Sequence, residues 1–571
     1  MSDDINANET NIDGIPGKGM IVQEEGLGYT ITVEREDLLK TATGLKEAGF
    51  DLFLFVTGVD YPDHIKLVYR IYSTKRKNRM AIIVKTDVPK SDPAVDSMAP
   101  LWPAANWHER EAYDLFGVEF KGHPDLRRIF MPEDWVGYPL RKDYSDDHML
   151  VSDGDKYARP PLSVIDSRAG DDAAAGKPSA RVEQAVAAEN ETGVAAASEL
   201  ERAIKDIKTD VLTINFGPQH PSAHGVFRGV FEVDGEIITR IDSHIGYLHR
   251  CFEKIAEHRT YTQFIPFTDR MDYLSAMLNN WGYTMSVEKL AEIAVPERAE
   301  YLRIIVGELN RIASHLVFLS TAAIETGALT PYFYYFDERE RILLLFEQLC
   351  GARFTYNYMR IGGVRIDAPE GWFDDVLAFC ERLEKSMVDY DKLLLGNYIF
   401  KKRMKGVAPF SAEQALSWGL TGPSLRASGV NYDVRKADPY SVYPRIDFDE
   451  VVLCNGDNLD RVIARSQEIR QSLKIIEQAV AQIPDGLIVT PDLPRYITPA
   501  PGEAYAHIES SRGDLGFFIV SDGSPKPYRV KIQGPSFGNL QALPAMATGC
   551  YFSDAVLIFG TLDTVFGEVD R

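Results

Sequence analysis

One stretch, 169–198, divides the 571-residue chain into two parts of unequal length. It contains eleven alanines and no aromatic residue. Such a segment buries too little apolar surface to offset the conformational entropy that ordering would cost. We therefore predict a linker over 150–206, a disordered arm over 1–18, and two folded domains over 19–149 and 207–571. Because alanine-rich sequence folds readily as a helix, a partner-binding helix within the linker remains the alternative.

The first domain combines strand and helix patterns. Runs rich in β-branched and aromatic residues predict strands at 29–35, 51–61, 65–73 and 79–88. Residues 36–50 are predicted to form a helix, and so are residues 91–102, which begin with a serine and contain a proline close behind it. This order of elements is typical of a small α+β sandwich.

The second domain begins with strand patterns and continues with long helical ones. Residues 210–216 and 226–241 alternate, and Asp234-Gly235 predicts a hairpin turn between two strands. Apolar residues that repeat every three or four positions predict helices at 296–326, 369–395 and 457–482. Ser411 and Gln414 fit a capping box, and the tail (505–569) is predicted to return to strands and turns. We therefore expect an α+β protein whose second domain is a helix bundle with peripheral sheets.

Charge and motif content exclude several functions. The net charge of −22 gives a field that repels phosphates, so no nucleic-acid partner is expected. No apolar run approaches the ~20 residues that a membrane span needs, and the acidic start does not resemble a secretory signal. The five cysteines form no CxxC pair, and no Gly-rich dinucleotide or phosphate loop occurs. We expect no iron–sulfur, zinc or nucleotide site built from this chain's own ligands.

Two histidines, His220 and His224, lie in the sequence GPQHPSAHG (217–225) between two strand patterns. Its prolines and glycines indicate a shaped loop rather than a helix. Three interpretations remain open from the residues alone. The histidines serve turn formation, they bind a metal, or they present an imidazole to a small polar ligand.

A second titratable group lies in the predicted helix 296–326. Glu308, Arg311 and His315 are spaced by three and four residues, so they share one helix face. His315 precedes the apolar run LVFL. It is either a core histidine bonded to a glutamate or the backbone, or a titratable group held against a redox centre.

Several longer motifs resemble subunits of one respiratory enzyme family. Residues 109–144, EREAYDLFGVEFKGHPDLRRIFMPEDWVGYPLRKDY, resemble the thirty-kilodalton C subunit of NADH:quinone oxidoreductase. Five further segments resemble the forty-nine-kilodalton D subunit of the same enzyme. They are GPQHPSAHGVFR (217–228), HIGYLHRCFEK (244–254), RMDYLSA (270–276), GPSLRASGVNYDVRKADPY (422–440) and residues 512–537. The order C then D on one chain resembles the fused C/D subunit of some bacteria.

The resemblance implies a quinone-reducing role. In this family the D subunit and the iron–sulfur B subunit together form the quinone site, and the last [4Fe–4S] cluster is carried by the latter. Reducing a quinone adds two electrons and two protons, so the site needs donors at the carbonyl oxygens. By match to the family, those donors are His224 and Tyr273. The quinone is the substrate, and the chain binds no cofactor through its own ligands.

The same match assigns three further residues. The family usually has an aspartate ten residues past His315, where this chain has Glu325, which keeps the charge on a side chain one methylene longer. Its implied role is to raise the basicity of the loop histidine and relay its proton. Arg270 and His315 match positions beside the cluster of the iron–sulfur neighbour, where positive charge would raise the reduction potential.

The D subunit is also similar, more distantly, to the large subunit of nickel–iron hydrogenases. The four metal-binding cysteines of that family correspond here to Asp272, Ser275, Val565 and Glu568. Without four thiolates the chain should not bind nickel and iron. The resemblance implies the same bundle architecture, with a cavity that became a quinone pocket.

The resemblance also implies partner subunits and a location in the cell. The chain should be inactive alone and assemble with the iron–sulfur B, ferredoxin-like I and catalytic G subunits and with the membrane H and A subunits. The complex would translocate protons, with this chain peripheral on the cytoplasmic face of the bacterial inner membrane and residues 109–144 docking partners. Two alternatives remain, namely a related complex with another electron donor, such as reduced ferredoxin or a deazaflavin, and a scaffold without a reacting residue.

Overall fold

The computed structural model describes residues 21–24, 26–75, 80–144, 211–219 and 225–571. The predicted arm (1–18) and linker (150–206) lie outside the described residues, and so does His224. We call residues 21–144 the N-terminal part and residues 211–571 the C-terminal part. Their division into domains at the linker stays a prediction.

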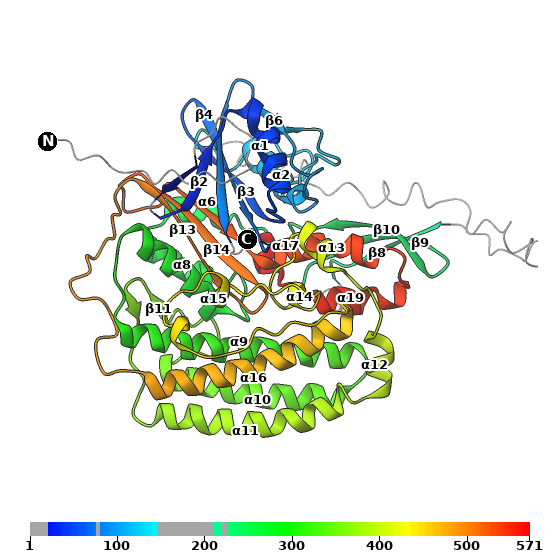
Figure 1. Cartoon of the computed structure of the whole chain (residues 1–571), viewed down its shortest axis with the longest axis vertical. Coiled ribbons are helices and arrows are strands. Elements are labelled where there is room, and N and C mark those ends of the chain that lie inside the picture. Colours follow the sequence, from blue (N-terminus) through cyan, green and yellow to red (C-terminus); the bar gives the residue numbers. More distant parts are fainter. Residues whose placement is uncertain (1–20, 25, 76–79, 145–210, 220–224) are drawn as a thin grey trace, which may run out of the picture.

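The N-terminal part is built on a five-stranded sheet with the order β1-β2-β5-β4-β3. Its strands are β1 (Ile21–Glu24), β2 (Gly28–Thr32), β3 (Leu52–Asp60), β4 (His64–Tyr72) and β5 (Ala81–Pro89). Strands β2 and β5 pair in parallel and the other neighbours pair antiparallel. Helices α1 (Leu38–Glu47) and α2 (Ala105–Phe116) lie beside the sheet in Figure 1, and α2 packs on β3. The four predicted strands and the first predicted helix are thereby confirmed.

The helix predicted over 91–102 is wrong. Residues Ala94–Asp96 form strand β6, which pairs in parallel with β7 (Glu119–Lys121). The carboxylate of Glu109, on α2, accepts hydrogen bonds from the Ser97 hydroxyl and from the Met98 N–H. That N–H therefore has a tertiary partner instead of a helical carbonyl, which local sequence does not reveal.

The C-terminal part is dominated by long helices that lie side by side in Figure 1. These are α9 (Glu297–Glu325), α10 (Leu329–Cys350), α11 (Trp372–Leu393) and α16 (Asn458–Gln482). Three of the four confirm the helices predicted from apolar periodicity. The predicted capping box is also present, since Ser411 and Gln414 exchange bonds at the start of α13 (Ala412–Ser417). No helix among the described residues is both long enough and apolar enough to span a membrane.

Two three-stranded antiparallel sheets lie in Figure 1 on the side of these helices that faces the N-terminal part. One contains β8 (Val211–Phe216), β9 (Arg228–Asp234) and β10 (Ile237–His244), and the other contains β13 (Gly502–Glu509), β14 (Asp514–Ser521) and β15 (Arg529–Gln533). After β15 the predicted strands are wrong, because the chain forms α17 (Pro535–Gln541), α18 (Leu543–Ala547), α19 (Ala555–Leu562) and α20 (Phe566–Asp570). Pro535 and Pro544 lie in the first turns of α17 and α18, where a proline is tolerated because its missing N–H would be unpaired anyway.

The remaining elements are short, apart from α8 (Ala276–Leu290), which packs on β13 and β14. They are α6 (Phe252–His258), α7 (Tyr261–Thr268), β11 (Met359–Arg360), β12 (Gly363–Val364), α12 (Tyr398–Met404), α14 (Gly422–Arg426) and α15 (Val434–Ala437). Single 3₁₀ turns occur at Arg35–Asp37, Tyr443–Arg445 and Phe552–Asp554. The protein is thus an α+β structure with a sheet-based N-terminal part and a helical C-terminal part.

Buried ion pairs join the two parts. Glu111 on α2 binds the ammonium of Lys531 and lies 3.1 Å from Nη2 of Arg571. Arg529 bridges the same boundary, with Nε 3.1 Å from the carbonyl oxygen of Gly58 and Nη2 2.6 Å from Oε2 of Glu253. These groups are almost fully buried. The segment 109–144, which is predicted to dock partner subunits, therefore contacts the chain's own C-terminal part through Glu111. Its contact with other subunits stays a prediction.

Candidate functional site

Tyr273 lies in the turn between α7 and α8, directly after Asp272. Its ring is half-buried, with its centroid 5.9 Å from that of Phe354. Burial raises the pKa of its phenol, Asp272 raises it further, and Arg512 opposes both. The side chain is therefore a protonated hydrogen-bond donor that gives up its proton only to a strongly basic acceptor.

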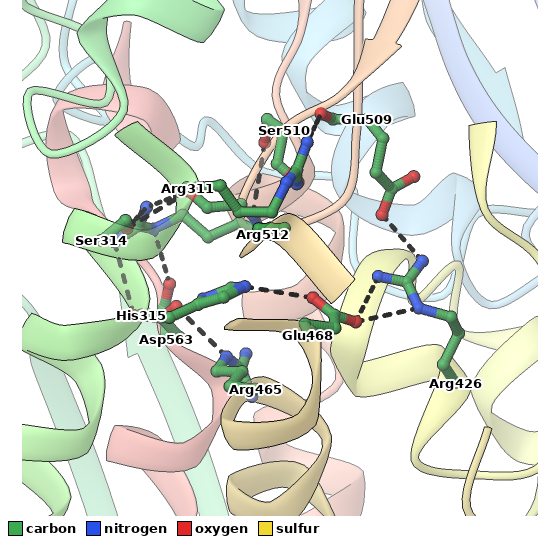
Figure 2. Close-up of polar contacts among 12 residues, drawn as sticks. Arg311, Ser314, His315, Arg426, Arg465, Glu468, Glu509, Ser510, Arg512 and Asp563 are labelled. Carbon is green, nitrogen blue, oxygen red and sulfur yellow. Dashed lines mark hydrogen bonds and ion pairs between the residues drawn. The ribbon is translucent and has the colours of Figure 1, made fainter. Parts of the chain in front are cut away.

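Arg512 lies in the turn between β13 and β14 and is fully buried. Its Nη1 lies 2.7 Å from Oδ2 of Asp272, 3.0 Å from Oγ of Ser275 and 2.7 Å from Oγ of Ser314. Its Nε donates to the carbonyl oxygen of Asp563 at 3.0 Å. One guanidinium thus connects the Tyr273 turn to α9 and to the segment before α20. Figure 2 shows its partners Ser314 and Asp563.

His315, on α9, is fully buried and faces α16. Its Nε2 lies 3.1 Å from Oε2 of Glu468, while its Nδ1 has no hydrogen-bond partner among the described residues. Because a carboxylate only accepts, the Nε2 atom carries the proton. Burial lowers the pKa of His315, and Glu468 opposes that shift.

His315 pairs with a glutamate of α16, and not with Glu308, which shares its face of α9. Arg311 pairs with Glu308, at 3.1 Å between Nε and Oε2, and leaves His315 to Glu468. His315 is thus a buried histidine bonded to a glutamate. Its placement beside a redox centre stays a prediction.

Glu468 belongs to a larger buried network. Its Oε1 accepts from Nη2 of Arg426 at 2.7 Å, and Arg426 also reaches Oε1 of Glu509 at 2.8 Å. Burial acts to raise the pKa of Glu468, but Arg426 and then His315 hold it well below its ordinary value. Asp563 binds Arg512 and lies 3.3 Å from Nε of Arg465, so the charges form paired clusters around the ends of β13 and β14 (Figure 2). Pairing of this kind is what makes buried charge tolerable.

The positions compared with hydrogenase cysteines form two pairs, one in contact with Arg512 and one in contact with Ser536. Asp272 and Ser275 both contact Arg512, while Val565 donates its N–H to Oγ of Ser536 at 3.3 Å. Glu568, on α20, accepts the Ser536 N–H at 2.9 Å through Oε2.

Glu568 is fully buried, and its Oε1 has no partner among the described residues. Burial and the charge of Asp272 raise the pKa of Glu568 to about 7. Across the described ranges, no group of three or more histidine, cysteine, aspartate or glutamate side chains is arranged to hold a metal ion.

Two predicted residues lie toward the edges of this region. Glu325 ends α9, and its carboxylate lies over Gly560 of α19, where an added Cβ would come within 2.4 Å of Oε2. Arg270 has a side chain 47% exposed, and its Nη1 lies 3.8 Å from Oδ2 of Asp269. The residues that precede Tyr273 and His315 in the chain, Asp272 and Ser314, both contact Arg512. Glu325 instead lies against α19.

Gly225, which follows His224 in the chain, lies against α20. A Cβ added to Gly225 would lie 3.4 Å from the ring of Phe566, on α20. The next residue of α20, Gly567, is packed so closely on the chain before Tyr273 that an added Cβ would lie 2.3 Å from the carbonyl oxygen of Met271. Gly225 therefore contacts the helix that supports the Tyr273 turn.

Sequence reasoning missed Arg512, Glu468 and Asp563 as site residues. A partial signal exists on the helix 457–482, where Arg461 and Arg465 interrupt an apolar face. Arginines at such positions indicate buried ion pairs, but the partners come from segments distant in sequence.

The chain matches two families of respiratory-chain subunits. Residues 31–148 match the family described as "Respiratory-chain NADH dehydrogenase, 30 Kd subunit". Residues 325–500 and 493–571 match the family described as "Respiratory-chain NADH dehydrogenase, 49 Kd subunit". The two matches follow each other in the order C then D.

Individual relatives cover either one part of the chain or both. The D subunit of the NADH-quinone oxidoreductase of Clostridium beijerinckii is 52% identical over 367 residues, which is 64% of this chain and 99% of the relative. The C/D subunit of the enzyme of Bdellovibrio bacteriovorus is 39% identical over 570 residues, or 95% of each chain. The C/D subunit of the Acidiphilium cryptum enzyme is 40% identical over 531 residues, 88% of this chain and 85% of the relative. The chain therefore belongs to the family of fused C/D subunits of NADH-quinone oxidoreductase.

Proposed function

We propose that this oxidoreductase subunit helps to form the quinone-reducing site of its complex, with Tyr273 and His224 donating hydrogen bonds and protons to the quinone headgroup. The observation that supports the proposal most is the half-buried Tyr273, held beside the buried Asp272–Arg512 ion pair. Quinone reduction consumes one proton at each of two carbonyl oxygens. A phenol and an imidazole can each supply such a proton and then be reprotonated.

The electrons would come from a [4Fe–4S] cluster on the neighbouring iron–sulfur B subunit. The closest two cysteines of this chain are about 30 residues apart in sequence, so we assign the cluster's ligands to that neighbour. Arg270 supports the proposed contact because about half of its side chain is exposed and available to another subunit. His315 is enclosed by this chain, so its influence on the cluster would be electrostatic rather than through direct ligation.

The proposal includes an assembly and an architecture. Residues 207–571 would carry the quinone site and residues 19–149 would dock the B, I and G subunits. The complex would be joined to the membrane H and A subunits on the cytoplasmic face and would translocate protons. The charge of Asp272 acts on Glu568, so one position from each pair lies near the other, which supports a bundle related to that of nickel–iron hydrogenases.

Purification of the complex through a tag on this chain tests the proposed function. We expect a cluster-bearing subunit and membrane-spanning subunits to co-purify, with NADH:quinone activity that a rotenone-class inhibitor blocks. An untagged strain provides the control. Recovery of the chain without a cluster-bearing partner, or with partners that reduce no quinone, would contradict the proposal.

Glu325→Gln is expected to lower quinone reduction several-fold, because it removes the charge proposed to support His224 while keeping the size of the side chain. Gly560→Ala should act in the same direction, since its Cβ would displace the Glu325 carboxylate. Rates in membranes with quinone, and with an artificial acceptor that bypasses the quinone site, provide the measurement. The matched control is Glu297→Gln, at the exposed other end of α9. Unchanged quinone turnover in Glu325→Gln would remove this residue from the mechanism.

A further inference from the structure

The buried guanidinium of Arg512 holds the turn that carries Tyr273 from both sides. Asp272 precedes Tyr273 and Ser275 follows it by two residues, and both contact the same nitrogen, Nη1, at 2.7 and 3.0 Å. Rotation or displacement of this turn would break both contacts at once. The position of the phenol is therefore coupled to the position of one arginine.

Arg512 is itself fixed by the surrounding structure. Its Nε donates to the carbonyl oxygen of Asp563 at 3.0 Å, and Nη1 lies 2.7 Å from Oγ of Ser314 on α9. A planar guanidinium with donors in fixed directions loses little freedom when it makes several such bonds. The geometry is thus set before any substrate arrives, as electrostatic catalysis requires.

The charge of Arg512 also acts on Tyr273. Burial and Asp272 both disfavour a negative charge on the phenol oxygen, and Arg512 is the cation that counters them. Because this region is buried, its electrostatic interactions are screened less than those at the surface. A tyrosinate formed here depends on Arg512 more than it would in water.

We propose that Arg512 is a positioning residue for quinone reduction, which clamps the Tyr273 turn and offsets the negative charge left on the phenol oxygen after proton transfer. This inference rests on the proposed function. Reduction of the quinone to the quinol would take two electrons, supplied one at a time by the iron–sulfur cluster of the neighbouring subunit, and two protons, one from Tyr273 and one from the second proposed donor. The O–H bond of Tyr273 breaks as an O–H bond forms on the quinone, and the tyrosinate remains until a proton from the protein returns.

A double-mutant cycle in the whole complex tests the proposal. Arg512→Gln is expected to lower kcat for quinone reduction at least ten-fold, and to enlarge the rate decrease in D₂O because proton transfer limits turnover more strongly. Arg512→Lys, which keeps the charge, should restore part of the rate. In a Tyr273→Phe background, Arg512→Gln should cause no further loss, because its effect acts through the phenol.

Matched variants separate this role from a structural one. Arg303 is also fully buried and paired, with Nη2 2.5 Å from Oε1 of Glu288, so Arg303→Lys controls for altering a buried arginine. We expect it to leave the D₂O effect unchanged. If Arg512→Gln does not assemble, Ser275→Ala removes one contact of the clamp and should lower the rate two- to five-fold, again only when Tyr273 is present.

The outcomes separate the proposed function from the role of Arg512. Full activity of Tyr273→Phe alone would overturn the proposed function. A slow Tyr273→Phe enzyme in which Arg512→Gln or Ser275→Ala causes the same fold-loss as in the wild type would overturn only the inference about Arg512. So would a D₂O effect that Arg512→Gln leaves unchanged.

Discussion

Replacing Tyr273 by phenylalanine is expected to lower the rate of quinone reduction by about 100- to 10,000-fold, the range typical for the loss of a positioned proton donor. The substitution removes only the hydroxyl and keeps the ring, whose centroid lies 5.9 Å from that of Phe354. Packing of the turn should therefore survive. Binding of quinone should weaken less than turnover slows, because the proton moves as charge develops on the reduced headgroup.

The expected loss follows from the environment of the phenol. Burial and Asp272 raise the pKa of Tyr273 above its ordinary value, so the side chain is protonated throughout the physiological pH range. It can then act as a donor but not as a base. Loss of activity with rising pH in this range would have to come from another group.

The measurement compares two activities of purified complex. NADH oxidation with quinone should fall, while oxidation with an artificial acceptor upstream of the quinone site should stay at the wild-type rate. Tyr398→Phe is the matched control, because that hydroxyl lies on an exposed side chain of α12. Full quinone turnover in an intact Tyr273→Phe complex would favour the scaffold interpretation.

The second large effect concerns stability. Glu468→Leu is expected to destabilise the C-terminal part by about 3–5 kcal/mol, because it leaves the fully buried guanidinium of Arg426 without its 2.7 Å partner. His315 loses its 3.1 Å partner in the same variant. A loss of this size is a large fraction of the stability of an ordinary domain, so the steady-state amount of assembled complex should also fall.

The pH dependence of this contribution has a definite sign. Because the folded-state pKa of Glu468 lies below its unfolded value of ~4.3, the stabilisation is fully present above that value. It is lost as the pH falls toward the folded-state pKa. Between pH 5 and 8 the Glu468 carboxylate itself should therefore add no pH dependence to the difference between wild type and Glu468→Leu.

Thermal unfolding of the purified complex, followed at several pH values, provides the measurement. The control is Glu477→Gln on the same helix, where the side chain is exposed and the expected change is below about 0.5 kcal/mol. A Glu468→Leu complex as stable as the control would show that the buried network does not hold the C-terminal part together.

The sequence predicted elements whose local pattern agrees with their packing. Helix α16 follows from apolar spacing because its exposed positions, such as Lys474 and Glu477, alternate with buried ones. Helix α9 is buried on all sides over 301–316, and its apolar period stays visible because charged residues such as Arg303, Glu308 and Arg311 occupy the positions between. Helix α10 is not predicted by that criterion. Its exposed Phe333 and Tyr334 share the helix with buried Tyr335 and Phe346, so apolar residues occur on both faces and hide the period.

The site was accessible from sequence only through the resemblance. The turn of Tyr273 is short and has no period, and its supporting arginine lies 240 residues away from Asp272. Likewise, helical spacing grouped His315 with Glu308, whereas the structure pairs it with Glu468, 153 residues distant. Such partners depend on how segments meet in three dimensions, which local spacing does not encode.

Photolabelling tests the central claim most directly. The purified complex is irradiated with a photoreactive quinone analogue, and labelled peptides of every subunit are identified by mass spectrometry, with and without an excess of a quinone-site inhibitor. The account predicts inhibitor-sensitive labelling of this chain within residues 217–228 or 270–276. Labelling confined to other subunits, or labelling of this chain that the inhibitor leaves unchanged, would contradict it.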